Sequence, residues 1–98
     1  MPAYKEKFIN ELDIKDSKIS VSGLIINKEE NLIVIDDGTS AITADIETNL
    51  PVNTFARVYG YLINNGEELR IRGQAIQDLS NADKKLYAKV KMLMNQKQ

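Results

Sequence analysis

A small all-β barrel followed by one amphipathic helix is the fold class that three features of the sequence predict. Residues 18–76 contain five short apolar segments with the alternating pattern of β-strands. The dipeptides Asp37–Gly38 and Asn65–Gly66 each stand between two of these segments and are strong hairpin-turn signals. Residues 79–96 instead place apolar side chains three or four positions apart, as an amphipathic helix does.

The expected strands cover residues 18–27, 32–36 and 40–47, followed by the two arms of the segment 56–76. Pro51 falls in the link before that segment, where its missing N–H does not interrupt a strand ladder. Five short antiparallel strands with tight turns are typical of a Greek-key barrel of the OB type. An SH3-like barrel is the main competing architecture.

Two glycines inside expected strands favour the OB type. Gly23 lies in the first strand and Gly60 in the fourth. The strands of a small barrel bend sharply, and glycine is the residue that permits such a bend.

The two ends of the chain are expected to be helical. Tyr4, Phe8 and Leu12 lie four apart in the N-terminal segment 1–17, which predicts a short amphipathic helix before a turn at residues 14–17. At the other end Ser80 is a suitable N-cap for the helix 79–96. The barrel itself is expected to span residues 18–77.

The turn at Asn65–Gly66 sets the register of the last hairpin. With these two as the turn residues, Leu62 faces Leu69 and Gly60 faces Ile71 toward the core. The outer face then carries polar pairs: Tyr61 with Arg70, Tyr59 with Arg72, and Arg57 with Gln74.

The turn at Asp37–Gly38 gives a different result for the first three strands. It pairs Ile35 with Ser40 and Ile33 with Ile42, and both faces of these strands remain apolar. A barrel wall in contact with water should instead alternate. The outward apolar side chains need a cover from either terminus or from another chain; they are Leu24, Ile26, Leu32 and Val34.

Composition limits the function. The chain has 98 residues, 43 % apolar and 28 % charged, as expected for a single domain over residues 1–98. It contains no cysteine and no histidine, so thiolate chemistry and the commonest general base are excluded. The net charge of −1 lacks the basic excess usual for binding a phosphate backbone. No signal peptide or membrane-spanning run is visible, so we expect an intracellular protein, cytoplasmic in a prokaryote or nuclear in a eukaryote.

Taken in order, the segments "ISVSGLIINKEENLIVIDDGTSAITADI" and "ARVYGYLINNGEELRIRGQAI" and the terminal amphipathic helix resemble a known family. The resemblance is to the OB domains of the middle and smallest subunits of replication protein A, and to related telomere-capping subunits. It covers roughly residues 9–95. It implies a role in DNA replication or repair, a barrel groove that binds single-stranded DNA, and terminal helices that join the subunits in a bundle.

This chain departs from the DNA-binding members of that family. They place aromatic residues near the end of the third strand and in the loop between the last two. Here those positions hold Glu47–Thr48 and Asn64–Asn65, and the chain has no tryptophan. Stacking on an aromatic side chain contributes about 1–3 kcal/mol per base, so the resemblance implies a weak DNA binder or none.

The candidate nucleic-acid residues are the outward arginines and tyrosines of the last hairpin: Arg57, Tyr59, Tyr61, Arg70 and Arg72. Arginine would contact phosphate and tyrosine would stack on bases. The alternative is a solvated sheet face held by cross-strand cation–π pairs. The carboxylates Glu67–Glu68 at the hairpin tip, and Glu29–Glu30 in another loop, would repel phosphate.

The candidate partner interface is the apolar stripe of the terminal helix together with the apolar outer face of the first strands. Its residues are Leu79, Leu86, Tyr87, Val90, Leu93, Met94, Leu24, Ile26, Leu32 and Val34. The breadth of the helix stripe favours a partner over a helix that only plugs the barrel end.

No catalytic or cofactor-binding pattern is present in the sequence. Asp36, Asp37 and Asp45 are the only hint of a metal site, and Asp37 is explained as a turn residue. We therefore predict a non-enzymatic subunit without cofactor, small-molecule substrate or membrane contact. Its partners would be other OB-fold subunits, held through a helix bundle, and possibly single-stranded DNA. The alternatives are an interaction module that binds no nucleic acid, and an RNA-binding OB domain.

Overall fold

The computed structural model describes residues 4–80, which form six strands and one 3-10 turn. The elements in chain order are β1 (Lys5–Glu6), η1 (Ile9–Glu11), β2 (Lys18–Glu29), β3 (Leu32–Asp36), β4 (Ala41–Asp45), β5 (Phe55–Asn64) and β6 (Leu69–Asp78).

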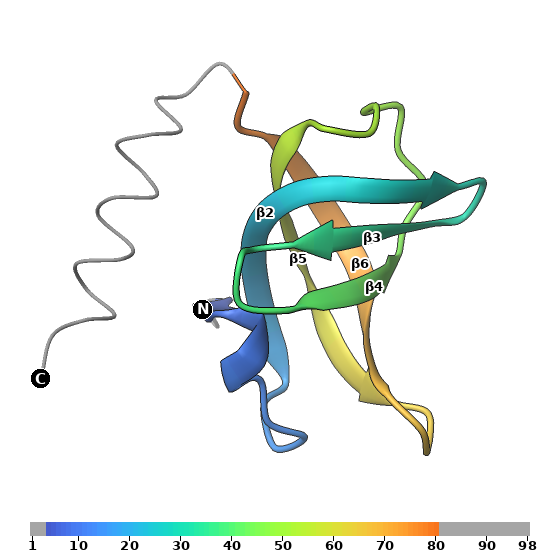
Figure 1. Cartoon of the computed structure of the whole chain (residues 1–98). Coiled ribbons are helices and arrows are strands. Elements are labelled where there is room, and N and C mark those ends of the chain that lie inside the picture. Colours follow the sequence, from blue (N-terminus) through green and yellow to red (C-terminus); the bar gives the residue numbers. More distant parts are fainter. Residues whose placement is uncertain (1–3, 81–98) are drawn as a thin grey trace, which may run out of the picture.

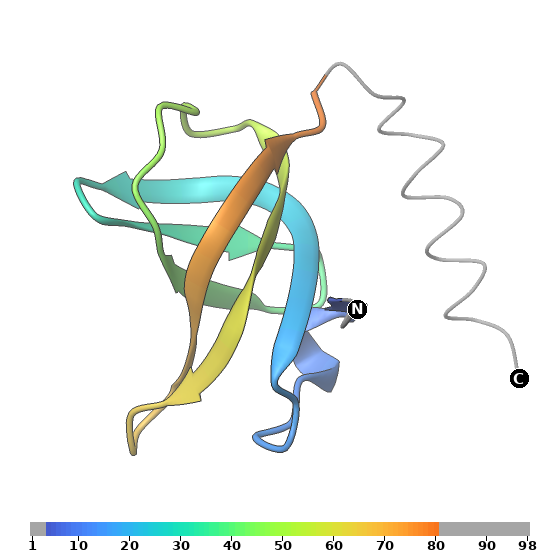
Figure 2. The same ribbon diagram turned by 180° about the vertical axis from the view of Figure 1, so that it is seen from behind.

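Five of the strands close into a barrel (Figures 1 and 2). The order is β2-β3-β4-β6-β5, and β5 pairs again with β2. All neighbours are antiparallel except β4 and β6, which run parallel. This arrangement is consistent with the predicted five-stranded Greek-key OB barrel, and β1 adds a short parallel strand to the outside of β2.

The long strand β2 closes the barrel because its first half pairs with β5 and its second half with β3. The two halves meet at Leu24, next to Gly23. A Cβ at Gly23 would overlap the carbonyl oxygen of Asp36, and one at Gly60 would overlap that of Arg72. Both positions therefore need glycine because backbone from the neighbouring strand occupies the space of a side chain, whereas the expected reason was a sharp bend of the strand.

The core consists of aliphatic side chains that point inward from every barrel strand. The fully buried large ones are Ile19, Val21, Ile25, Ile33, Ile35, Val58 and Ile71. The predicted inward faces of the first, second and fifth barrel strands are thus confirmed, as is that of Val58 and Gly60 in the fourth.

The register expected for both hairpins is wrong by two residues. Leu62 pairs with Ile71, not with Leu69. In the other hairpin Ile35 pairs with Ile42, not with Ser40. A shift of two residues preserves which face each side chain occupies, and for this reason the inward faces were still predicted correctly.

The shift arises because each glycine dipeptide begins a four-residue loop, not a two-residue turn. A type I′ turn needs positive φ at both central residues, but Gly38 and Gly66 have φ of 92° and 97° while Asp37 and Asn65 do not adopt positive φ. A backbone bond closes each loop, from the Asp37 N–H to the Ser40 carbonyl at 3.2 Å and from the Asn65 N–H to the Glu68 carbonyl at 3.3 Å, and side-chain bonds add to it. Asp37 Oδ1 accepts from the N–H of Thr39 at 2.9 Å, and Asn65 Oδ1 accepts from the N–H of Glu67 at 3.1 Å.

The predicted pairing of Arg57 with Gln74 is also wrong, because the last hairpin contains a β-bulge. The register shifts between Tyr59 and Gly60, so Arg57 lies opposite Gln77 and not opposite Gln74. The partners change from Gly60 with Gly73 to Tyr59 with Ala75, which leaves Gln74 as the extra residue.

The expected N-terminal helix is also wrong. Residues 5–6 form β1 and only residues 9–11 form a 3-10 turn, while the predicted turn after them is present as an Asp16 N–H bonded to the Asp13 carbonyl at 2.7 Å. The start of η1 is held by the neighbouring hairpin, since Asp37 Oδ2 accepts from the Ile9 N–H at 2.7 Å. A tertiary hydrogen bond therefore replaces the helical bonds that the spacing predicted.

The predicted terminal helix lies outside the described residues, apart from Leu79 and Ser80 at its start. No helix within residues 4–80 is long and apolar enough to cross a membrane.

The Asp37 side chain is expected to contribute more to stability than its counterpart Asn65. Both side chains accept hydrogen bonds from N–H groups of their own loop, but only Asp37 also accepts one from the Ile9 N–H of η1. Asp37→Ala should lower the free energy of unfolding by about 2–3 kcal/mol and Asn65→Ala by about 1 kcal/mol, as measured by urea denaturation. Equal losses for the two variants would contradict the assigned role of the Asp37–Ile9 bond.

Candidate nucleic-acid interface

The candidate arginines and tyrosines belong to the outer face of β5 and β6. These two strands run side by side, with β2 beside β5 and β4 beside β6 (Figure 2). Strand pairing arranges them in rows across the sheet. Ser22, Arg57 and Gln77 form one row, and Lys18, Tyr61 and Arg72 form another. Tyr59 lies between these rows, opposite Ser20.

Arg57 is engaged inside the chain. Its Nε donates to Ser22 Oγ at 3.1 Å and lies 3.6 Å from Glu6 Oε1. Glu6 also accepts from the buried hydroxyls of Ser20 and Ser22, at 2.6 and 3.1 Å. The Glu6 carboxylate thus links β1 to β2 and β5, and its charge offsets the charge of Arg57.

Tyr59 is likewise covered by the N-terminal segment. Its ring meets the ring of Tyr4 edge-on, with centroids 5.3 Å apart. Its hydroxyl donates to Gln77 at 2.9 Å and accepts from Arg57 at 3.3 Å. Because neighbours hold both the ring and the hydroxyl, Tyr59 is poorly placed to stack on a base.

Arg70 is the most tightly paired of the candidate arginines. Its guanidinium donates through both Nε and an NH2 group to the two carboxylate oxygens of Asp45, and lies 3.3 Å from Glu68. The hydrogen bonds that Arg70 donates to Asp45 hold the pKa of Asp45 below its usual value and raise the pKa of Arg70. The positive charge of Arg70 is therefore compensated by Asp45 and Glu68.

Of the five candidate residues, Tyr61 and Arg72 are left as the candidate contact surface for nucleic acid. The structure places Lys18 beside them. Tyr61 is 38 % exposed and lies opposite both Lys18 and Arg72. The Lys18 amine lies 5.7 Å from the Tyr61 ring centroid and 5.5 Å from that of Tyr4. Arg72 is exposed and has no salt bridge within residues 4–80, but it lies opposite Asp45 on β4 and its charge helps to lower the pKa of Asp45. We call Lys18, Tyr61 and Arg72 the cationic row.

Sequence reasoning missed Lys18, although a signal was available. Lys18 alternates with the inward Ile19 and so belongs to the outer face of its strand. Only the pairing of the first and fourth barrel strands brings it next to Tyr61, and that contact follows from barrel closure.

The apolar outer face of the first strands is present. Leu24 and Ile26 are 40 % and 47 % exposed, while Leu32 and Val34 are half-buried. Leu79, by contrast, is 7 % exposed, and its N–H donates to the carbonyl of Phe55 at 2.8 Å. The other candidate partner residues, 86–94, lie outside the described residues.

The metal-site hypothesis finds no support among residues 4–80. Within that range no three histidine, cysteine, aspartate or glutamate side chains are grouped so that they would hold an ion. Asp37 is engaged as a loop acceptor and Asp45 as the partner of Arg70.

The fold has clear relatives among solved structures. The telomere-capping protein Ten1 from S. pombe superposes with a TM-score of 0.76 at 18 % identity, over 97 % of this chain and all of that one. A chain of the S. pombe Stn1–Ten1 complex gives 0.75 at 14 % identity, over 99 % and 96 % of the two chains. The hypothetical protein ygiW from E. coli gives 0.59 at 15 % identity, over 79 % and 90 %.

Sequence comparison alone does not find these relatives. No model of a known protein family matches the chain, and no curated protein sequence matches it. The sequence resemblance to telomere-capping OB subunits is thus supported by structural neighbours, and identities below one fifth limit this likeness to the fold.

The Arg70–Asp45 pair predicts a specific pH dependence. The folded pKa of Asp45 is lower than its value of 3.8 in the unfolded chain, so the pair stabilises the fold above that pH. The contribution is lost as pH falls through the lowered pKa. Asp45→Asn should therefore reduce the free energy of unfolding at neutral pH by up to about 1 kcal/mol, and this difference from wild type should shrink in acid.

Denaturant melts at several pH values measure this difference. Glu47→Gln, at an exposed position, serves as the control and should match the wild type throughout. A difference for Asp45→Asn that stayed constant into strong acid would argue against the assigned pairing.

Proposed function

We propose that this chain is a non-catalytic OB-fold subunit of a telomere-capping or replication-protein-A-like complex that binds single-stranded DNA. The observation that supports the proposal most is the whole-length likeness to Ten1 and to a chain of the Stn1–Ten1 complex. The second of these neighbours comes from a complex of two proteins, so we infer that the present chain also works with another OB-fold subunit.

The C-terminal segment is proposed as the main site of assembly. Its apolar residues recur at helical spacing after the barrel ends, and the stripe that includes Leu86 and Val90 is broader than one face of a small barrel needs. The apolar outer face at Leu24 and Ile26 is proposed as an additional contact.

The contribution of the barrel to DNA binding is proposed to be small and local. Internal acceptors engage Arg57 and Arg70, so the cationic row is the remaining basic surface of the predicted patch. One exposed tyrosine between two cations fits a single stacked base with adjacent phosphates. The alternative, an interaction module without DNA binding, is favoured by the same internal pairing of the two arginines.

Assembly is tested by recovery of a partner. Tagged chain expressed in its source cell should co-purify with an OB-fold protein, and Leu86→Asp with Val90→Asp should abolish that recovery by placing charge in the apolar stripe. Lys85→Asp with Lys91→Asp, away from the stripe in the sequence pattern, is the control that should retain the partner. Unchanged recovery by the Leu86/Val90 variant would contradict the assembly proposal.

DNA binding is tested on the purified complex with a fluorescent oligo-dT. Lys18→Ala with Arg72→Ala should weaken binding and lower the slope of log affinity against log salt by about 1–2, because two phosphate contacts are lost. Lys5→Ala with Lys15→Ala removes the same charge outside the row and should bind as wild type does. If both double variants bind alike, the row has no role and the interaction-module alternative is favoured.

A further inference from the structure

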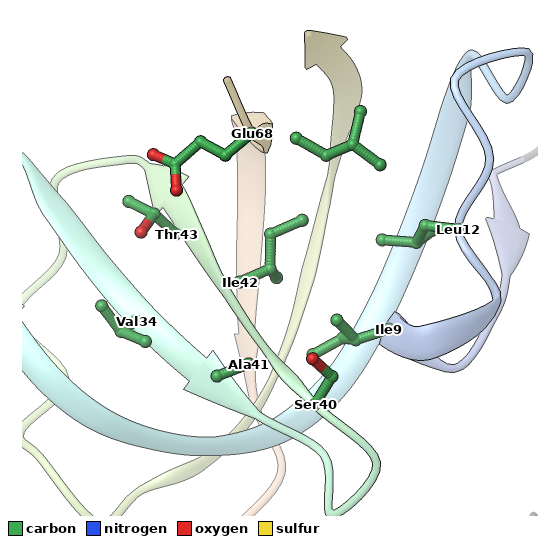
Figure 3. A pocket seen from close by; sticks show the side chains of 9 residues that line it. Ile9, Leu12, Val34, Ser40, Ala41, Ile42, Thr43 and Glu68 are labelled. Atoms are coloured by element: carbon green, nitrogen blue, oxygen red, sulfur yellow. The ribbon is translucent and has the colours of Figure 1, made fainter. Parts of the chain in front are cut away.

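A pocket of about 320 Å³ opens between β4, η1 and the tip of the β5–β6 hairpin (Figure 3). Its apolar lining includes Ile9 and Leu12 from the N-terminal segment, Ile42 from β4 and Leu69 from β6. Ser40, Thr43 and Glu68 add polar groups. The volume lies at the lower end of the range for ligand sites and suits one or two large side chains.

The walls of the pocket are fixed before any ligand arrives. Ile9 and Ile42 are each 7 % exposed and belong to the barrel core. The Ile9 N–H is bonded to Asp37, and the N–H of Asn10 donates to Thr39 Oγ1 at 3.3 Å, so the β3–β4 hairpin holds η1 in place. A preformed pocket avoids part of the ordering cost of binding.

The charge of this pocket differs from that of the cationic row. No lysine or arginine lines it, whereas Glu68 does, with a side chain that is 55 % exposed. Glu67 and Glu11 are also exposed and adjoin lining residues in the chain. The one ion pair of Glu68 among the described residues is with Arg70, at 3.3 Å, and Arg70 is held more closely by Asp45. Glu68 can therefore accept a second cation while Arg70 stays in place.

From these features we propose that the pocket binds a segment of a partner protein, with an aromatic or aliphatic side chain inserted and an adjacent lysine or arginine paired with Glu68. Charge complementarity selects this occupant, because an acidic rim attracts a basic peptide and repels a phosphate backbone. The site shares no residue with the cationic row. Its lining includes Val34 of the apolar outer face, and the proposal does not rest on the C-terminal stripe.

The test uses the full-length chain and a phage-displayed library of random dodecapeptides. Selection should enrich peptides that join a large apolar residue to lysine or arginine. A synthetic copy of the best peptide, labelled for fluorescence anisotropy, should bind Glu68→Arg at least about tenfold more weakly than wild type. Ala41→Trp, which fills the pocket from an exposed lining position, should abolish binding. Glu29→Arg makes the same charge change outside the pocket and should leave affinity unchanged.

Thermal melts should first establish that the variants are folded. If Glu68→Arg or Ala41→Trp is not, Thr43→Trp provides a second block at a lining position. Three results would overturn the proposal: no enriched peptide, enriched peptides that are acidic, or affinities insensitive to the pocket variants. A loss of oligo-dT binding on Ala41→Trp, with peptide binding intact, would instead assign the pocket to nucleic acid. Failure to recover a partner through the C-terminal stripe would leave this result unaffected.

Discussion

The hydrogen bonds of the Asp37 carboxylate hold together the β3–β4 loop and η1. One oxygen accepts from Thr39 and Ser40 and so forms the loop that sets the β3–β4 register. The other accepts from Ile9 and fixes η1 against that loop. This bond positions Ile9, which belongs to the core and also lines the pocket. A residue that the sequence marks only as a turn signal therefore connects the N-terminal segment, a hairpin and a candidate binding site.

Much of the fold follows from local patterns, and the errors have a common cause. The alternation of Ile19, Val21 and Ile25 and the glycines at 23 and 60 gave the barrel and its inward faces. Register depended instead on how the Asp37 and Asn65 side chains bond within their loops, which a dipeptide does not specify. The spacing of Tyr4, Phe8 and Leu12 predicted a helix. In the structure this segment instead bonds to the β3–β4 loop and pairs with β2, and such tertiary contacts leave no mark in local spacing.

The candidate site shows the same division between local and tertiary information. The sequence places the five candidate residues on one face. The structure has Arg57, Tyr59 and Tyr61 at alternate positions of β5, and Arg72 opposite Tyr61. Which of them keep a free charge depends on Glu6 and Asp45, contributed by other strands. Charge pairing across a closed barrel cannot be read from one hairpin, so the sequence overestimates the available basic surface. It also omits Lys18.

Arg57 and Arg70 are paired with carboxylates of the barrel, and we propose on this ground that the outer faces of residues 4–80 suit proteins better than DNA. The most direct test is the affinity of the purified full-length wild-type chain, without partners, for oligo-dT at physiological salt. We predict a dissociation constant weaker than about 10 µM, in the range of non-specific electrostatic binding. A nanomolar dissociation constant that persists as salt is raised would contradict this account, because it would require stacking platforms and free cations beyond the cationic row.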